Sequence, residues 1–130
     1  MDQATHVSGL LSVEVADEST KQGTLCVLDS AGKLTPWTEG ADDAAALMVT
    51  LVDPGERGKL VSAALAGNQP GSVLVNAVAG TYTAGMPVYA ATGGAVTAAS
   101  GTRQVGTIAK TATLADPGMV EVFLVYIPKA

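Results

Sequence analysis

Few side chains in this sequence are of the types that carry out catalysis or bind metals. The chain contains a single histidine, His6, and a single cysteine, Cys26. A nucleophilic Cys–His pair needs an activated thiol with a base held rigidly beside it. Cys26 lies in the apolar run "GTLCVLD", and His6 lies in a polar start without a strand or helix pattern. We therefore expect Cys26 to be a small buried hydrophobic residue and predict no nucleophilic site.

Carboxylates are the remaining candidates for chemistry. Asp42 and Asp43 are adjacent in the polar stretch "TEGADD", which is typical of a solvated loop and lacks the pattern of a calcium-binding loop. An enzyme would need one of them to meet Asp53 or Asp116 in a cleft. The sequence has no phosphate-binding or dinucleotide-binding glycine motif. We predict no catalytic, cofactor-binding or metal-binding residue, and we do not expect an enzyme.

The composition predicts a folded β protein. The 130 residues are 48% hydrophobic but only 4% aromatic, and they include 15 glycines. The formal net charge of −5 opposes binding to a phosphate backbone, and no apolar run approaches the roughly 20 residues of a membrane span. One cysteine excludes an internal disulfide, and "MDQATHVSG" lacks a signal-peptide pattern, so we expect synthesis in a reducing cytoplasm.

Short strands and turns alternate through residues 21–130, which we expect to form one β domain. The stretches "TLCVL" and "KLTPW" flank the turn "DSAG", and "VGTIAKTATL" is expected to be one strand. The run "MVEVFLVYI" is apolar on both faces, which predicts a central strand. No long helix is expected. The predicted fold class is mainly β, with short strands arranged in a compact barrel or sandwich.

Residues 1–20 are expected to form an N-terminal arm. Leu11, Val13 and Val15 alternate with Ser12 and Glu14, the pattern of a half-buried strand. Two interpretations remain open: the arm pairs with a partner protein, or it supplies the first strand of the domain's own sheet.

The sequence contains an internal similarity. "TLVDPG" at residues 50–55 resembles "TLADPG" at residues 113–118, and several glycines match when the chain is shifted against itself by 62 positions. Asp-Pro-Gly is typical of a turn. We predict half-repeats at residues 23–66 and 80–127, with Pro54 and Pro117 at equivalent corners. The alternative is two unrelated halves that use the same turn residues.

Trp37 is the only tryptophan and stands just before a polar loop. It is either a core residue or an interface anchor, because tryptophan is enriched at protein interfaces.

Two segments carry a family resemblance. Residues 25–53, "LCVLDSAGKLTPWTEGADDAAALMVTLVD", and residues 80–125, with "TAGMPVYA" and "VGTIAKTA", resemble the head decoration (cement) proteins of tailed bacteriophages, the group of the lambda decoration protein. The resemblance implies a β-tulip fold and a homo-oligomer, most often a trimer, although the apparent duplication leaves a dimer open.

The resemblance also implies a function. Such proteins bind the major capsid protein on the outer surface of the expanded head, stabilise the shell by bridging its subunits, and are virion proteins made in the host cytoplasm. Their N-terminal arms add a strand to the major capsid protein, so the resemblance implies that the arm at residues 1–20 binds the capsid. The alternative is another virion structural module, such as a tail-tube, fibre or head-completion protein. Neither nucleic acid nor membrane is an expected partner. The candidate partner-binding residues are Val7, Leu10, Leu11, Val13, Val15 and Trp37.

Overall fold

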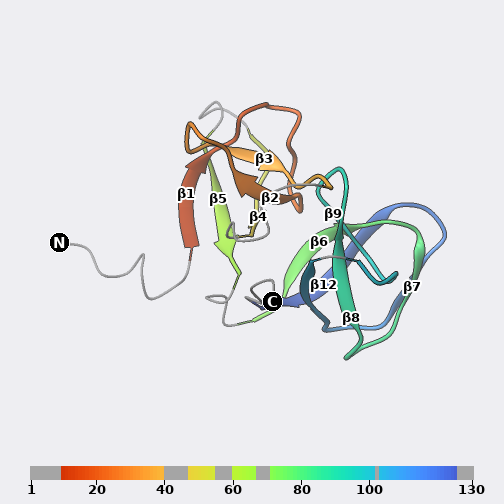
Figure 1. Cartoon of the computed structure of the whole chain (residues 1–130). Coiled ribbons are helices and arrows are strands. Elements are labelled where there is room, and N and C mark those ends of the chain that lie inside the picture. Colours follow the sequence, from red (N-terminus) through yellow and green to blue (C-terminus); the bar gives the residue numbers. More distant parts are fainter. Residues whose placement is uncertain (1–9, 40–46, 55–59, 67–70, 102, 126–130) are drawn as a thin grey trace.

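Strands make up all of the regular secondary structure in the described part of the chain. The computed structural model describes residues 10–39, 47–54, 60–66, 71–101 and 103–125, and it shows twelve strands and no helix there. The strands form two neighbouring lobes, one built mainly from the first half of the chain and one from the second (Figure 1). The predicted fold class, a mainly β compact domain that includes a barrel, is confirmed.

The first lobe is a five-stranded sheet. Its strand order is β1-β5-β4-β2-β3, and neighbouring strands are antiparallel. The two end strands approach each other at one parallel bridge between Val15 and Leu34, so we call this lobe the first barrel. Its strands are β1 (Leu10–Glu14), β2 (Leu25–Leu28), β3 (Leu34–Pro36), β4 (Met48–Thr50) and β5 (Leu60–Leu65).

The second lobe is a closed five-stranded barrel with the order β10-β12-β6-β9-β8. A separate two-stranded ribbon, β7 (Gly80–Tyr82) with β11 (Ala112–Leu114), accompanies it. The barrel strands are β6 (Val73–Ala77), β8 (Pro87–Ala91), β9 (Ala95–Thr97), β10 (Gln104–Ile108) and β12 (Gly118–Leu124).

The two barrels share one pairing scheme. Replacing β1, β2, β3, β4 and β5 by β6, β8, β9, β10 and β12 converts the strand neighbours of the first barrel into those of the second. The closing contacts also correspond. The Ala16 amide donates to Leu34 O at 2.9 Å, and the Val78 amide donates to Val96 O at 3.0 Å. The donor and the acceptor of the second bond lie 62 residues after those of the first, at 78 instead of 16 and at 96 instead of 34.

The correspondence does not extend to the two Asp-Pro-Gly turns. The Gly23 amide donates to Thr50 O at 2.7 Å, and the Gly85 amide donates to Ile108 O at 2.8 Å, so Thr50 corresponds to Ile108. Thr113 lies instead in β11, a strand without a counterpart among the described residues of the first barrel. The second "TLxDPG" therefore follows an added segment, and Pro54 and Pro117 are not equivalent corners.

Other expectations need adjustment. The segment 105–114 is two strands, β10 and β11, and the chain turns between them at Ala109–Thr111. Each barrel also begins one strand earlier than the predicted half-repeat, because β1 pairs with β5 and β6 pairs with β12. Of the two interpretations of the arm, residues 10–14 follow the second, since they form a strand of the domain's own sheet.

Two groups of apolar side chains form the core. One fills the first barrel, because Cys26, Leu34 and Met48 point inward there together with Val15, Val61 and Ala63. The larger group joins the interior of the second barrel to the outer side of β2, β4 and β5. Trp37 belongs to the larger group and is only 1% exposed. The two barrels therefore share buried apolar surface.

Candidate functional site

The structure buries two of the predicted partner-binding residues, Val15 and Trp37. Val15 is fully buried inside the first barrel and Trp37 lies in the shared core, so neither side chain is on the surface of this chain. Val13 is half-buried. Leu10 and Leu11 pair through their backbones with Ala64 and Ala63 of β5, and Val7 lies outside the described residues.

The groups considered for chemistry are not assembled into a site. Burial raises the pKa of the Cys26 thiol to about 12, which keeps it protonated and unreactive at neutral pH. The Asp53 carboxylate accepts a hydrogen bond from the Gln22 amide at 2.7 Å and so holds a turn. His6, Asp42 and Asp43 lie outside the described residues. Within the described segments, His, Cys, Asp and Glu side chains do not gather in groups of three or more that suit a metal ion.

The edge of β1 is the first surface feature that suits a partner. β1 stands at one end of the strand order and pairs with β5 along one side. Its other side meets β3 only beyond its end, at Val15 and Ala16. The Leu10–Val13 part of that edge therefore has backbone donors and acceptors that the described strands do not use. Such an edge accepts an added strand from another chain.

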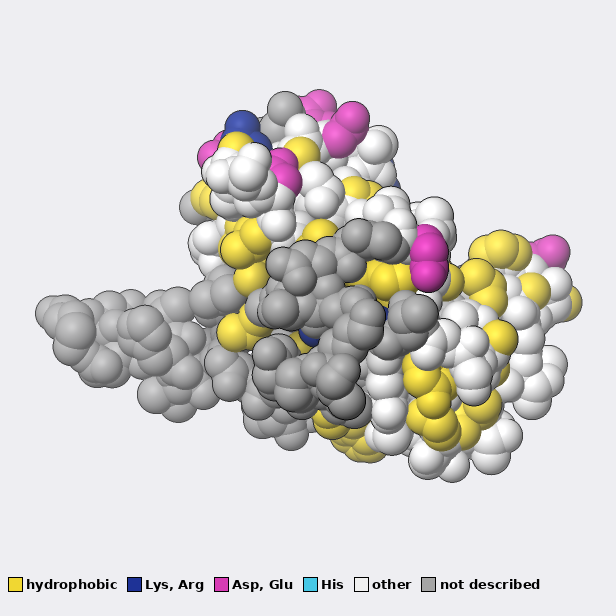
Figure 2. Space-filling model, viewed as in Figure 1, with side chains coloured by type: hydrophobic (Ala, Val, Ile, Leu, Met, Phe, Trp, Pro, Cys, Tyr) yellow, Lys and Arg dark blue, Asp and Glu magenta, His cyan; other side chains and the backbone are white. Residues whose placement is uncertain are grey.

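A second feature is an apolar patch on the second barrel. Leu74 of β6 and Phe123 of β12 are 44% and 48% exposed, although their strand neighbours are buried. Leu74 lies opposite Glu121 in the β6–β12 pair, so Phe123 is its diagonal neighbour on the same outer face. We call these two residues the outer patch. Figure 2 shows hydrophobic side chains on both barrels, and acidic side chains gather near the top of the first.

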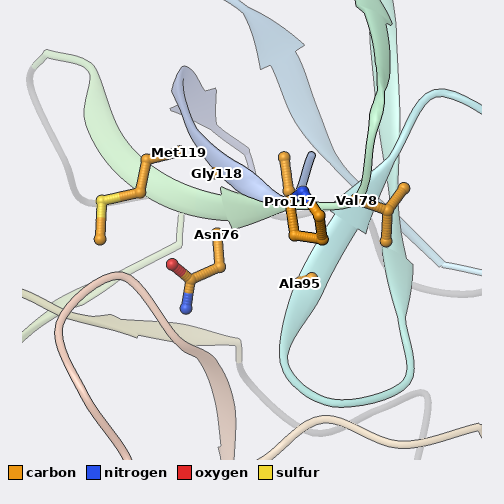
Figure 3. A pocket seen from close by; sticks show the side chains of 7 residues that line it. Asn76, Val78, Ala95, Pro117, Gly118 and Met119 are labelled. Carbon is orange, nitrogen blue, oxygen red and sulfur yellow. The ribbon is translucent and has the colours of Figure 1, made fainter. Parts of the chain in front are cut away.

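A groove of about 410 Å³ lies at the closing seam of the second barrel. Asn76 and Met119 stand at one end of it, and Val78, Ala95 and Pro117 stand at the other (Figure 3). Its lining is mainly apolar and carries no ionisable side chain. The groove adjoins the first barrel, because the Asn76 amide donates to Gly23 O at 2.8 Å. It therefore belongs to the contact between the barrels.

Comparison with known proteins adds no assignment. Neither a protein-family model, nor a curated protein, nor a solved structure matches this chain. The resemblance to phage decoration proteins thus depends on the quoted residues alone.

The sequence also contains features whose meaning emerges only in the structure. The apolar pattern of residues 119–127 indicated a strand buried on both faces, but β12 buries one face and exposes Phe123 on the other. Apolar residues on both faces of this run were the one sequence feature that could have indicated an apolar patch on the surface. Arg103, which directly precedes β10, is almost completely buried. Among the described residues, no helix is long and apolar enough to cross a bilayer.

Proposed function

We propose that this protein is a decoration protein that binds the outer surface of an expanded phage head and stabilises the shell by bridging major capsid protein subunits. The observation that carries the proposal is the position of β1. The arm that the resemblance assigns to the capsid includes an edge strand, and none of the described strands pairs with the outer side of its Leu10–Val13 part. The resemblance of residues 25–53 and 80–125 supports the same function.

The rest of the molecule is suited to a binding role. Its described ionisable groups are solvated, engaged in turns or buried, and its two barrels share one core of buried apolar residues. A molecule with a strand edge at one place and an apolar patch at another can touch more than one neighbour. Acidic side chains on the first barrel are compatible with a position outside the shell, away from packaged DNA.

The mechanism is mechanical clamping. A plug that contacts several subunits stabilises only the lattice in which those subunits stand at the correct spacing. Each contact is weak alone, but the first contact raises the effective concentration for the others. Specific binding of this kind requires a total interface above roughly 1,000 Å² per bound chain. Expansion of the head supplies the spacing, so binding follows expansion.

Co-sedimentation tests this proposal. Purified protein is mixed with expanded, undecorated shells and separately with unexpanded precursors of the same major capsid protein. We expect saturable binding to expanded shells and at least about tenfold weaker binding to precursors, which corresponds to about 1.4 kcal/mol. Decorated shells should also disrupt at a higher temperature than undecorated ones.

Equal binding to both kinds of shell, or binding to neither, would contradict the proposal. Assembly of the pure protein into long tubes or fibres without any shell would favour the alternative virion module.

A further inference from the structure

In the contact between the two barrels of one chain, each barrel contributes a different surface. The outer row of the first barrel, formed by Leu25, Val49 and Ala64 on neighbouring strands, is completely buried. The tip of the β8–β9 hairpin of the second barrel covers the Leu25 end of this row. The Leu25 amide donates to Gly94 O at 2.8 Å, and the Gly94 amide donates to Trp37 O at 3.1 Å. We call the covered face of the first barrel the acceptor surface and the hairpin tip that packs on it the donor surface. These names describe the packing of the two barrels and not the direction of the hydrogen bonds.

At two glycines, Gly94 and Gly23, the barrels lie too close together for a larger residue to fit without a shift. A Cβ on Gly94 would lie 2.5 Å from Thr24 Cγ2 and 2.9 Å from Leu25 O. On the acceptor side, a Cβ on Gly23 would lie 3.0 Å from the terminal carbon of Met119. Both glycines are therefore enclosed by the other barrel.

The repeat supplies a second acceptor and a second donor, and both are uncovered. The row Pro87, Thr107 and Phe123 in the second barrel corresponds to Leu25, Val49 and Ala64. Pro87 and Phe123 are exposed where their counterparts are buried. Gly85 and Gly32 correspond to Gly23 and Gly94, and no atom lies within 4 Å of a Cβ built on either.

Two of the exposed large hydrophobic residues, Leu28 and Phe123, lie on these two uncovered surfaces. Leu28, at the end of β2 beside the β2–β3 turn, is 43% exposed on the donor side. On the acceptor side, Phe123 of the outer patch takes the position of the buried Ala64, and Leu74 takes the position of the exposed Ser12. We infer that the uncovered surfaces bind each other between two copies of this chain: the β2–β3 hairpin tip of one copy packs on the row Pro87, Thr107 and Phe123 of the next.

The contact between copies differs in detail from the contact within a chain. Pro87 has no amide hydrogen, so it cannot repeat the bond that Leu25 makes to Gly94. Phe123, at the position of Ala64, supplies a larger apolar surface in its place. The bond from the Asn76 amide to Gly23 O can be repeated, because its counterpart is the Glu14 amide of one copy and Gly85 O of the next. Apolar packing therefore carries most of this contact.

A contact between two different surfaces is head-to-tail. It produces a closed ring if the rotation between copies closes, and an open filament if it does not. This inference does not depend on a capsid as partner. A small closed ring is compatible with the proposed function, whereas a filament would keep the contact and contradict the decoration role.

Sedimentation equilibrium of the full chain over a dilution series tests the inference. We expect reversible association of the unaltered chain, and an association at least about tenfold weaker for Phe123→Thr and for Leu28→Thr. Threonine keeps strand propensity while it removes the apolar surface. Val52→Thr is the matched control, because Val52 is 47% exposed but lies on neither surface. That variant should associate like the unaltered chain.

A mixture of the two variants distinguishes a head-to-tail contact from a symmetric one. Phe123→Thr keeps an intact hairpin tip and Leu28→Thr keeps an intact outer patch, so the mixture should form one-to-one dimers that neither variant forms alone. A monomeric unaltered chain would overturn the inference. So would association that neither substitution weakens, or a mixture that stays monomeric. If the unaltered chain is monomeric but Phe123→Thr loses shell binding, the outer patch belongs to the capsid contact and the proposed function stands.

Discussion

Two glycines in equivalent hairpins, Gly94 and Gly32, have the same backbone conformation but different surroundings. Gly94 and Gly32 occupy equivalent hairpin positions with nearly the same φ, +80° and +79°. A non-glycine residue in this left-handed region costs about 1 kcal/mol. The surroundings differ, because Gly94 is enclosed by Thr24 and Leu25 whereas Gly32 faces open space. The pair therefore separates backbone strain from crowding at the joint.

We predict that Gly94→Ala lowers the free energy of unfolding by about 2–4 kcal/mol, the sum of backbone strain and overpacking. Gly32→Ala should cost only about 1 kcal/mol. Urea titration followed by Trp37 fluorescence measures both, since the only tryptophan lies in the shared core. Equal losses in the two variants would show that the barrels do not meet at Gly94.

Cys26 makes a prediction about reactivity and pH. Burial raises the pKa of its thiol from 9.0 to about 12. The native thiol should therefore resist a thiol-specific reagent at pH 8, whereas the urea-unfolded chain should react fully. Because the folded state holds this proton more tightly than the unfolded state, the effect on stability is absent below about pH 8. Stability then falls as the pH rises from 9 toward 12.

Cys26→Ala supplies the control for the pH effect. Other groups also titrate in this range, so only the difference between the two proteins is attributed to the thiol. The loss of stability between pH 9 and pH 11 should be smaller in Cys26→Ala. Identical slopes, or rapid labelling of the native protein, would contradict the burial of Cys26.

At the scale of elements, β1 has two roles to reconcile. One side of it completes the first barrel through β5, and the other side is the edge assigned to the capsid. Deleting residues 1–15 should destabilise the first barrel, because it removes one of five strands and uncovers Val61 and Ala63. Thermal unfolding and amide hydrogen exchange of β5 measure this effect. Unchanged protection of β5 would indicate a purely external arm.

Local patterns were sufficient to predict much of the strand and turn content. The β2–β3 hairpin follows from Asp29, whose carboxylate accepts from the amides of Ala31 and Lys33, and from Gly32 at positive φ. The similarity between "TLVDPG" and "TLADPG" misled the alignment, because these are common turn residues and the second copy follows the added β11 strand. The residues of the two barrels are matched by their hydrogen-bond register. That register depends on contacts between residues distant in sequence, so a local sequence match cannot supply it.

The partner surfaces could be predicted less well than the strands. Alternation places Val15 on an apolar face but does not say whether that face meets a partner or the chain's own core. Trp37 was ambiguous for the same reason. Phe123 was misassigned in the opposite direction, since an apolar residue on the outer face of β12 looks like core until the other strands are placed. The exposure of a side chain depends on how all the strands pack together, so the local sequence predicts it poorly.

The whole molecule is a pair of similar barrels joined through one shared core, with a strand edge and an apolar patch on different parts of its surface. We propose the strand edge as the contact with the shell and the patch as the contact with the next copy. Under this proposal each contact strengthens the other, because the first to form raises the effective concentration for the second.

A cryo-EM map of expanded shells incubated with the protein tests the central claim most directly. We predict density for the protein on the outer surface, with the Leu10–Val13 edge of β1 continued by a strand of the major capsid protein. A map without bound protein, or with the protein bound while that edge of β1 faces solvent, would contradict the account.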